Sequence, residues 1–224
     1  MALTKRVLVF DAYGTLFDPH SIIPTCEHAF PQRGKELSHL WRTKQLEYSW
    51  LRSLMGQYED FWQVTESALV FACKTLHLPC DAPTRSSLMD AYLSLEPYPD
   101  AREAMSTLAN YPMAILSNGC PSMLQAVVQR AKFESFFSHV ISVDEARIFK
   151  PSPRVYRLVE EKLAVDRKAI AFVSSNSWDA IGAKAFGFWS CWVNRSDSCR
   201  DELGFGPDLS VRRLTELVGT FPAV

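Results

Sequence analysis

Four short polar segments, each close to the end of an apolar run, hold the side chains of this sequence that are best suited to catalysis. They are Asp11–Thr15, Ser117–Gly119, Arg147–Pro151 and Ser174–Asp179. Together they supply two carboxylates, a lysine, asparagine amides and several hydroxyls. A carboxylate can act as a nucleophile or as a general base, and a lysine beside it favours its ionised form. We therefore interpret the four segments as parts of one active site and not as a binding patch.

The apolar runs indicate how these segments would meet. Continuous apolar runs of four or five residues are typical of strands buried on both faces of a parallel sheet. They predict strands at 6–10, 113–116, 139–143, 170–173 and 189–193. Helical patterns predict helices at roughly 100–110, 121–132, 152–164 and 178–186. This alternation indicates a Rossmann-like, doubly wound α/β core, whose strands would present the polar segments along one edge of the sheet.

The interval between the first and second strands is too long for a single crossover helix. Within it, apolar residues recur at helical spacing in the ranges 37–55, 61–76 and 88–95. A proline-rich segment, Glu96–Pro99, follows them. We therefore predict an inserted helical cap domain over residues 18–97, with residues 1–17 and 98–224 forming the catalytic core.

Composition limits the possible partners. The chain has 224 residues, 24 basic and 25 acidic side chains, and 47% hydrophobic residues. This length fits one full domain and a smaller second one, and the charge balance lacks the basic excess of a nucleic-acid-binding protein. No apolar run approaches the roughly 20 residues that cross a bilayer, and the first run is too short for a signal-peptide core. The six cysteines form no C-x-x-C pair, so we expect a cytoplasmic protein with free thiols.

The polar segments resemble, in order, the four motifs of the haloacid dehalogenase superfamily. The first motif is matched by Asp-Ala-Tyr-Gly-Thr-Leu at 11–16, and the other three by Ser117-Asn118, Lys150-Pro151 and the segment 174–179. Further matches, at 40–42, 45–48, 58–62, 186–188 and 191–195, make nearly the whole chain similar to the (S)-2-haloacid dehalogenases. This resemblance implies hydrolysis without a metal or organic cofactor, a small 2-haloacid substrate and a homodimer.

Tyr13 favours this branch of the superfamily over its phosphatases. The resemblance places Tyr13 where phosphatases carry a second aspartate that protonates the leaving alkoxide. A halide ion is a weak base and leaves without a proton, so a dehalogenase has no need of that acid. Two alternatives remain. One is a Mg²⁺-dependent phosphatase or phosphonate hydrolase that uses Asp11 and Asp179 as metal ligands. The other is an inactive relative that serves as a binding protein, against which the intact set Asp11, Lys150 and Asp179 argues.

The resemblance implies a covalent first step. Asp11 would attack the carbon that bears the halogen, form an ester and release halide with inversion, which converts (S)-2-haloalkanoic acids into (R)-2-hydroxy acids. Lys150 would supply a positive charge beside the nucleophile. Thr15 and Ser174 would orient its carboxylate by hydrogen bonds.

In the second step that the resemblance implies, water attacks the ester carbonyl. Asp179 would be the base that activates this water, with Asn176 and Lys150 orienting it. Tyr156 matches a tyrosine of the family whose hydroxyl supports the site.

The resemblance also implies a set of substrate contacts. Ser117 and backbone amides near Asn118 would bind the substrate carboxylate, and Arg42 from the cap would attract the departing halide together with Asn176 and Trp178. Thr43 departs from the glutamine that the family often carries there, which affects the polarity of the pocket. The expected contacts are Ala12, Tyr13, Arg42, Leu46, Phe61, Ser117, Asn118 and Trp178.

Overall fold

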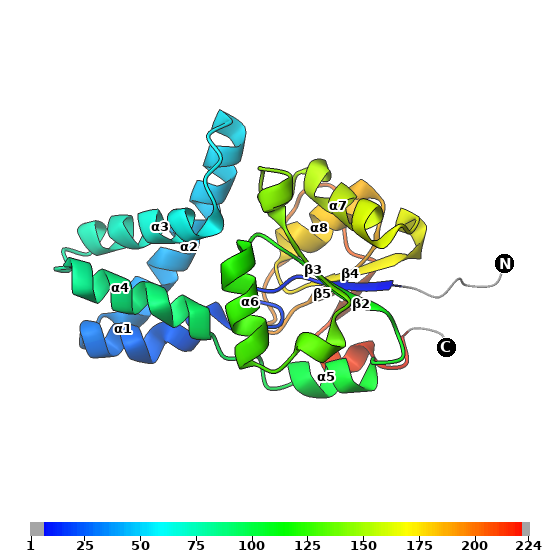
Figure 1. The fold of residues 1–224 in the computed structure, drawn as a ribbon, viewed down its shortest axis with the longest axis horizontal. Coiled ribbons are helices and arrows are strands. Elements are labelled where there is room, and N and C mark those ends of the chain that lie inside the picture. Colours follow the sequence, from blue (N-terminus) through cyan, green and yellow to red (C-terminus); the bar gives the residue numbers. More distant parts are fainter. Residues whose placement is uncertain (1–6, 221–224) are drawn as a thin grey trace.

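A six-stranded parallel sheet forms the centre of the protein, for which a computed structural model describes residues 7–220 (Figure 1). The strand order is β3-β2-β1-β4-β5-β6. The strands are β1 (Val7–Phe10), β2 (Met113–Ser117), β3 (His139–Ser142), β4 (Ile170–Ser174), β5 (Trp189–Val193) and β6 (Leu209–Val211). The chain moves outward from β1 in both directions, and this reversal opens a site at the carboxyl ends of β1, β2 and β4. Arg6, which begins the first predicted strand, lies outside the described residues.

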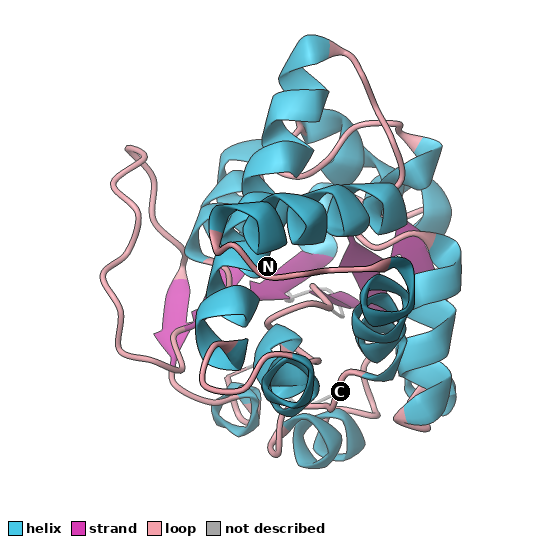
Figure 2. Cartoon of the chain, turned by 90° about the vertical axis from the view of Figure 1, so that its left-hand side faces the viewer, coloured by secondary structure: helices cyan, strands magenta, loops and turns pink. Residues whose placement is uncertain are grey.

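Four helices cover the two faces of this sheet. They are α5 (Ala101–Thr107), α6 (Pro121–Arg130), α7 (Pro153–Leu163) and α8 (Ser177–Phe186). Right-handed crossovers place α5 and α6 on one face and α7 and α8 on the other, and Figure 2 shows helices above and below the strands. Every residue of β1, β2 and β4 is buried between these layers. The predicted doubly wound α/β core is confirmed.

The insertion between β1 and β2 consists of helices, as predicted. They are α1 (Ile23–Ala29), α2 (Gly34–Met55), α3 (Phe61–Thr75) and α4 (Ala82–Ala91), and they lie to the left of the sheet in Figure 1. Asp60 caps α3 by accepting a hydrogen bond from the Gln63 amide at 2.9 Å, and α2 ends at Gly56, whose φ of 66° suits a residue without a side chain. With 22 residues, α2 is about 33 Å long and extends beyond the helices that pack on it.

Two antiparallel segments join these helices to the core. The amide of Asp18 donates to the carbonyl of Glu96 at 2.9 Å, and the amide of Tyr98 donates to that of Leu16 at 2.9 Å. The chain therefore leaves and re-enters the core at adjacent points. The domain boundaries at 17/18 and 97/98 stay a prediction.

Short 3-10 segments complete the described chain. They are η1 (Pro19–Ile22), η2 (Tyr92–Ser94), η3 (Glu134–Phe136), η4 (Val143–Glu145), η5 (Arg167–Ala169) and η6 (Leu214–Leu217). None of the helices between residues 7 and 220 has both the length and the apolar character needed to cross a bilayer.

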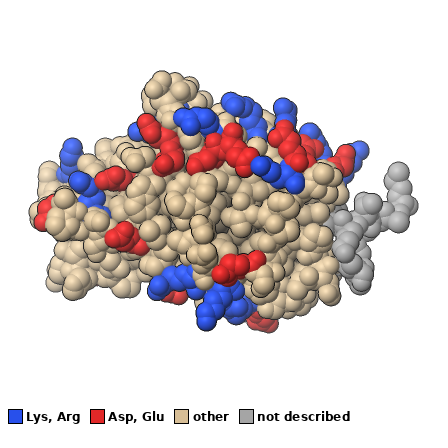
Figure 3. Space-filling model, in the orientation of Figure 1, with Lys and Arg blue, Asp and Glu red and all other residues tan. Residues whose placement is uncertain are grey.

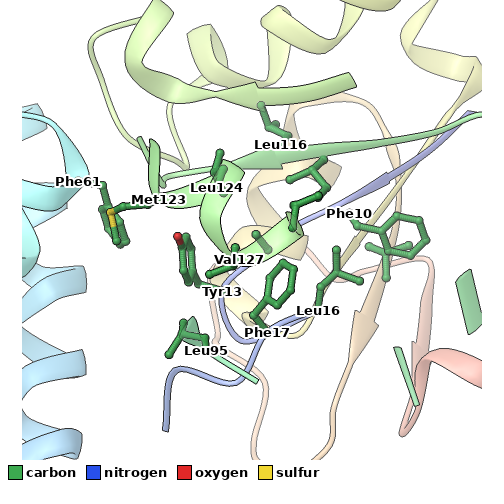
Figure 4. Packing of buried hydrophobic residues seen from close by; sticks show 14 of the residues in the cluster. Phe10, Tyr13, Leu16, Phe17, Phe61, Leu95, Leu116, Met123, Leu124 and Val127 are labelled. Carbon is green, nitrogen blue, oxygen red and sulfur yellow. The ribbon is translucent and has the colours of Figure 1, made fainter. Parts of the chain in front are cut away.

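The apolar core continues from the sheet into the contact with the cap. Figure 4 shows Tyr13, from the turn after β1, near Phe61 of α3 and near Leu124 and Val127 of α6. The rings of Tyr13 and Phe61 are 5.7 Å apart between centroids, and both side chains are buried. The cap therefore packs directly on the loop that follows β1.

Candidate active site

Lys150 bridges two buried carboxylates at the carboxyl edge of the sheet. Its Nζ lies 3.0 Å from Asp11 Oδ1 and 2.9 Å from Asp179 Oδ2. Asp11 follows the last residue of β1, Lys150 lies in the connection from β3 to α7, and Asp179 belongs to the first turn of α8. All three side chains are at least 90% buried, so their charges interact with little screening by water. The topology thus brings together the three ionisable residues that the sequence analysis singled out.

The second oxygen of Asp11 accepts several hydrogen bonds. Thr15 Oγ1 lies 3.0 Å and Asn176 Nδ2 2.8 Å from Asp11 Oδ2, whereas Ser174 Oγ is more distant at 3.5 Å. Thr15 is itself fixed because its hydroxyl accepts from the amide of Ser175 at 2.8 Å. These contacts hold the carboxylate in one orientation, which a nucleophile requires.

Burial and charge act in opposite directions on Lys150 and Asp179. Burial raises the pKa of Asp179 to about 6, although Lys150 lowers it, and the charge of Asp11 adds to the rise. For Lys150, burial lowers the pKa, but the charges of Asp11 and Asp179 outweigh this and the pKa is raised. Lys150 is therefore an ammonium ion at neutral pH, and Asp179 is an ionised carboxylate with the basicity of a general base.

Tyr156 holds the other oxygen of Asp179. Its hydroxyl donates to Asp179 Oδ1 at 2.7 Å, and burial raises its pKa well above the usual range, so it stays a donor. A Cβ at Gly182 would lie 2.6 Å from this hydroxyl, so only glycine at that position leaves room for the contact. Asp179 is thus fixed between a phenol and an ammonium group.

The turn after β1 connects the core with the cap. Gly14 has a φ of 94°, a conformation that favours glycine, and it allows the turn to pass close to Asn176. The carbonyl of Tyr13 accepts from Asn176 Nδ2 at 3.1 Å and from Arg42 Nη2 at 3.3 Å. Ala12, predicted to touch substrate, is buried, and its carbonyl accepts backbone hydrogen bonds within this turn.

Arg42 is held in place by Gln45, which was not a predicted site residue. Gln45 is completely buried, and its Oε1 accepts from Arg42 Nη1 at 2.6 Å. Gln45 Nε2 in turn donates to Thr65 Oγ1 of α3 at 2.6 Å. Gln45 could have been recognised as a site residue from the sequence, because it follows Arg42 by three residues and so lies on the same face of the helix. Thr65 could be recognised only from the packing of α2 on α3. Thr43 is exposed and donates to the carbonyl of His39.

A cavity of about 380 Å³ opens beside these residues. Three of its lining residues, Arg42, Leu46 and Asn176, were predicted site residues. Tyr98 and Arg195 also line it and were not predicted to do so; Arg195 lies over the Tyr98 ring at 4.1 Å. The cavity therefore gives a small molecule room beside a guanidinium and an amide.

Three other predicted residues of the candidate site form contacts with groups other than Asp11. Ser117 Oγ accepts from the amide of Gly119 at 3.1 Å, and Asn118 Oδ1 accepts from the amide of Lys150 at 3.0 Å. Trp178 is half-buried and packs edge to face on Trp50 at a centroid distance of 5.4 Å. Asn118 thus fixes the backbone of the lysine, a contact that the sequence analysis did not foresee.

The site also contains an apolar wall. Phe61 contacts Tyr13 and lies 6.0 Å from Phe149 between ring centroids. The Tyr13 hydroxyl is buried without a hydrogen-bond partner in the described structure, and burial raises its pKa. Within residues 7–220, no three His, Cys, Asp or Glu side chains gather in a way that could hold a metal ion.

Comparisons with known proteins agree on one family. The model of the haloacid dehalogenase-like hydrolases matches residues 5–187. The chain is 52% identical over 214 residues to (S)-2-haloacid dehalogenase 2 of Pseudomonas sp. strain CBS-3, which covers 95% of this chain and 93% of that protein. It is 50% identical over 216 residues to the (S)-2-haloacid dehalogenase of Pseudomonas sp. strain YL, which covers 96% of this chain and 93% of that protein.

A solved structure extends this similarity to the fold. The L-2-haloacid dehalogenase of Xanthobacter autotrophicus with chloropropionic acid covalently bound superposes with a TM-score of 0.91. The two chains are 43% identical, and the match covers 96% of this chain and 97% of that chain.

We predict that Lys150→Met lowers the free energy of unfolding by about 3–5 kcal/mol at pH 8, because it leaves two buried carboxylates without their cation. Without the lysine, burial still raises the pKa of Asp179 and the cation that lowers it is gone, so this carboxyl group takes up a proton as the pH falls. The loss is therefore smaller at pH 5 than at pH 8. Urea unfolding at both pH values measures it.

The matched control is Lys162→Met, since Lys162 forms an exposed ion pair with Glu145. This control is expected to lose less than about 1 kcal/mol at either pH. An equal loss in the two variants, or a loss in Lys150→Met that grows toward pH 5, contradicts the assignment of Lys150 as the buried counterion.

Proposed function

The chain belongs to the haloacid dehalogenase-like hydrolases, and from this we infer that it hydrolyses (S)-2-haloalkanoic acids to (R)-2-hydroxy acids and halide. The names of relatives about half identical to this chain support this substrate class. The observation that carries the proposal is the buried arrangement of Asp11, Lys150 and Asp179, which contains a nucleophile, its counterion and a base.

In the first step, a carboxylate oxygen of Asp11 bonds to the carbon that bears the halogen. The electrons of the carbon–halogen bond leave with the halide, and the carbon inverts. The Lys150 ammonium and the hydrogen bonds from Thr15 and Asn176 support this step because they fix the carboxylate in a site without bulk water.

Substrate binding uses both the core and the cap. Ser117 and the backbone amides near Asn118 bind the substrate carboxylate, close to the start of α6. Arg42 attracts the departing halide, and its contact with Gln45 keeps the guanidinium at the cavity. The aliphatic and aromatic walls, with Leu46 among them, exclude water from the reacting carbon.

In the second step, Asp179 removes a proton from water, and the water oxygen attacks the carbonyl carbon of the Asp11 ester. The tetrahedral intermediate expels the alkoxide of the hydroxy acid, which takes a proton back from Asp179. Asp11 is left as a carboxylic acid that carries the second proton of the water, and loss of this proton to solvent restores its carboxylate. Contacts with Lys150 and Tyr156 support this role, since they orient the base.

Phosphate ester hydrolysis is not favoured. A phosphatase needs an acid two residues after the nucleophile, and this position is Tyr13. Its hydroxyl is buried and has a raised pKa, so it is a poor proton donor to a leaving group.

We further propose that the protein is a cytoplasmic homodimer that pairs through the end of α2. Leu51, Leu54 and Met55 of this helix are exposed by 43%, 84% and 62%, and they form an apolar surface that a second copy would cover. All six cysteines are free thiols, which supports a reducing compartment. The proposed cap, residues 18–97, would then carry the interface, and the core the reaction.

A single turnover in H₂¹⁸O with enzyme in excess tests the covalent step. The hydroxy acid is expected to contain ordinary oxygen, with the label in Asp11, because water attacks the ester carbonyl and not the substrate carbon. Mass spectrometry of the product and of the Asp11 peptide measures both. Label in the product of the first turnover would show direct attack by water. Asp11→Asn is expected to abolish turnover, and Asp18→Asn, which alters a carboxylate that caps η1, is the control.

A second prediction concerns the acid limb of the pH profile. Formation of the hydroxy acid falls about tenfold per pH unit below the pKa of Asp179 in the ester intermediate, because only the carboxylate form accepts the proton from water. This pKa lies below the value of about 6 in the free enzyme, since the ester removes the charge of Asp11. Below this pKa, halide release in a single turnover continues and the ester accumulates. Asp179→Asn is expected to give the same accumulation at pH 8. A hydroxy-acid rate that is unchanged from pH 8 down to the lowest pH at which the protein stays folded would contradict this role.

The dimer prediction is tested by Leu54→Glu. A charge at this exposed position is expected to convert a dimer into monomers without loss of helix content, because Leu54 makes no core contact in the single chain. Light scattering after size exclusion measures the mass. Met123 is buried, so Met123→Glu is not a suitable control. The control is Leu203→Glu, because Leu203 is exposed and lies outside α2. A monomeric parent protein, or a Leu54→Glu variant that stays dimeric, refutes the proposed surface.

A further inference from the structure

A second, polar cavity lies between the end of α2 and the start of α7. Its volume is about 510 Å³, compared with about 380 Å³ for the cavity beside Arg42. Residues of both the inserted helices and the core line it, and none of them belongs to the reaction site. Its lining comprises Arg52, Ser53, Gly56, Gln57, Tyr58, Arg147, Ile148 and Arg154.

The charge of this cavity is unbalanced. Arg52, Arg147 and Arg154 bring three guanidinium groups to it, and none of them forms an ion pair with a carboxylate in the described part of the chain. Figure 3 shows acidic and basic side chains interspersed along the upper edge of the molecule, over α7 and beside the end of α2. Two of the acids near α7 are already paired with other cations, Glu145 with Lys162 and Glu160 with Arg167.

Uncharged groups fix the three arginines in place. Arg52 Nη1 donates to the carbonyl of Gln57 at 3.3 Å, and Arg154 Nη2 donates to that of Ala146 at 2.9 Å. The guanidinium of Arg147 lies 5.1 Å from the centre of the Tyr58 ring. These contacts orient each guanidinium but leave its charge and most of its N–H donors available.

The carboxylate of Asp144 is affected by the charge of one of these arginines. Arg147 lowers the pKa of Asp144, but burial, the largest effect, raises it. The Asp144 Oδ1 atom also accepts a hydrogen bond from the Tyr58 hydroxyl. Asp144 is thus engaged with the tyrosine and provides at most one negative charge for three cations.

We propose that this cavity binds a small phosphate-type dianion, either inorganic phosphate or the phosphate group of a phosphomonoester. The planar guanidinium fork matches phosphate oxygens with paired hydrogen bonds, and several such forks are best satisfied by an anion with more than one charge. A haloacid substrate carries a single charge, and the lining contains no carboxylate that could act as its nucleophile.

The bound anion would join the two parts of the chain. Arg52 comes from α2, whereas Arg147 and Arg154 come from the core. Ser53, in the same lining, accepts a hydrogen bond from the amide of Phe149 at 3.1 Å, directly before Lys150. Anion binding therefore stabilises the contact between the cap helix and the segment that carries Lys150.

Isothermal titration of the full-length protein with inorganic phosphate tests the site, at a constant ionic strength of about 0.15 M. The expected dissociation constant is below about 1 mM. Arg52→Gln with Arg147→Asn is expected to weaken binding at least tenfold. Asparagine is chosen because Arg147 has a φ of 48°, which asparagine tolerates. Arg130→Gln, which removes an exposed arginine on α6, is the matched control and keeps the parent affinity.

Three further comparisons, between ligands and between variants, decide the proposal. A lower dissociation constant for glycerol 3-phosphate than for inorganic phosphate supports a phosphomonoester as the ligand. A lower dissociation constant for inorganic phosphate supports the free ion. Equal binding of acetate refutes the dianion assignment. Phosphate binding that is absent, or equal in the double variant and the parent, overturns the site, and circular dichroism of the double variant verifies that its fold is intact.

Discussion

The ammonium group of Lys150 between two buried carboxylates is the interaction on which the rest of this structure depends. Burying one cation and two anions costs desolvation free energy, and one cation cannot neutralise both partners. The surrounding hydrogen bonds compensate for the remaining charge: Thr15 and Asn176 donate to Asp11, and Tyr156 donates to Asp179. The strand order is what allows these groups to meet, because β1 lies between β2 and β4 and their carboxyl ends share one edge.

The inserted helices contribute a side chain to the site at this edge of the sheet and do not only cover it. Arg42 reaches the carbonyl of Tyr13 in the core, and a buried chain through Gln45 and Thr65 ties Arg42 to α3. The position of one guanidinium therefore depends on the packing of two helices. A shift of α2 against α3 would move Arg42 relative to Asp11 without any change in the core.

The sequence was sufficient to predict those strands and helices of the fold in which continuous apolar runs are buried. The five predicted strands and the helices between them are present, and β1, β2 and β4 gave the clearest signal because they are enclosed by helices and so need apolar residues on both faces. Strand β6 was missed because it has three residues at the sheet edge, of which only Val211 is buried. Helix α1 was missed because it is seven residues long and contains Pro24. The contact of Gln45 with Thr65 joins residues 20 apart on two helices, and no spacing within one helix reveals it.

The same lysine also links the two proposed chemical steps. In the free enzyme the charge of Asp11 contributes to the raised pKa of Asp179, whereas Lys150 lowers that pKa. When Asp11 becomes an ester it loses its charge, so this repulsion disappears and Asp179 is left as the only anionic partner of Lys150. The pKa of Asp179 must then fall, which keeps the carboxylate deprotonated at the stage when it has to accept a proton from water. A separate switch for the base is unnecessary, because formation of the ester itself prepares Asp179 for the second step.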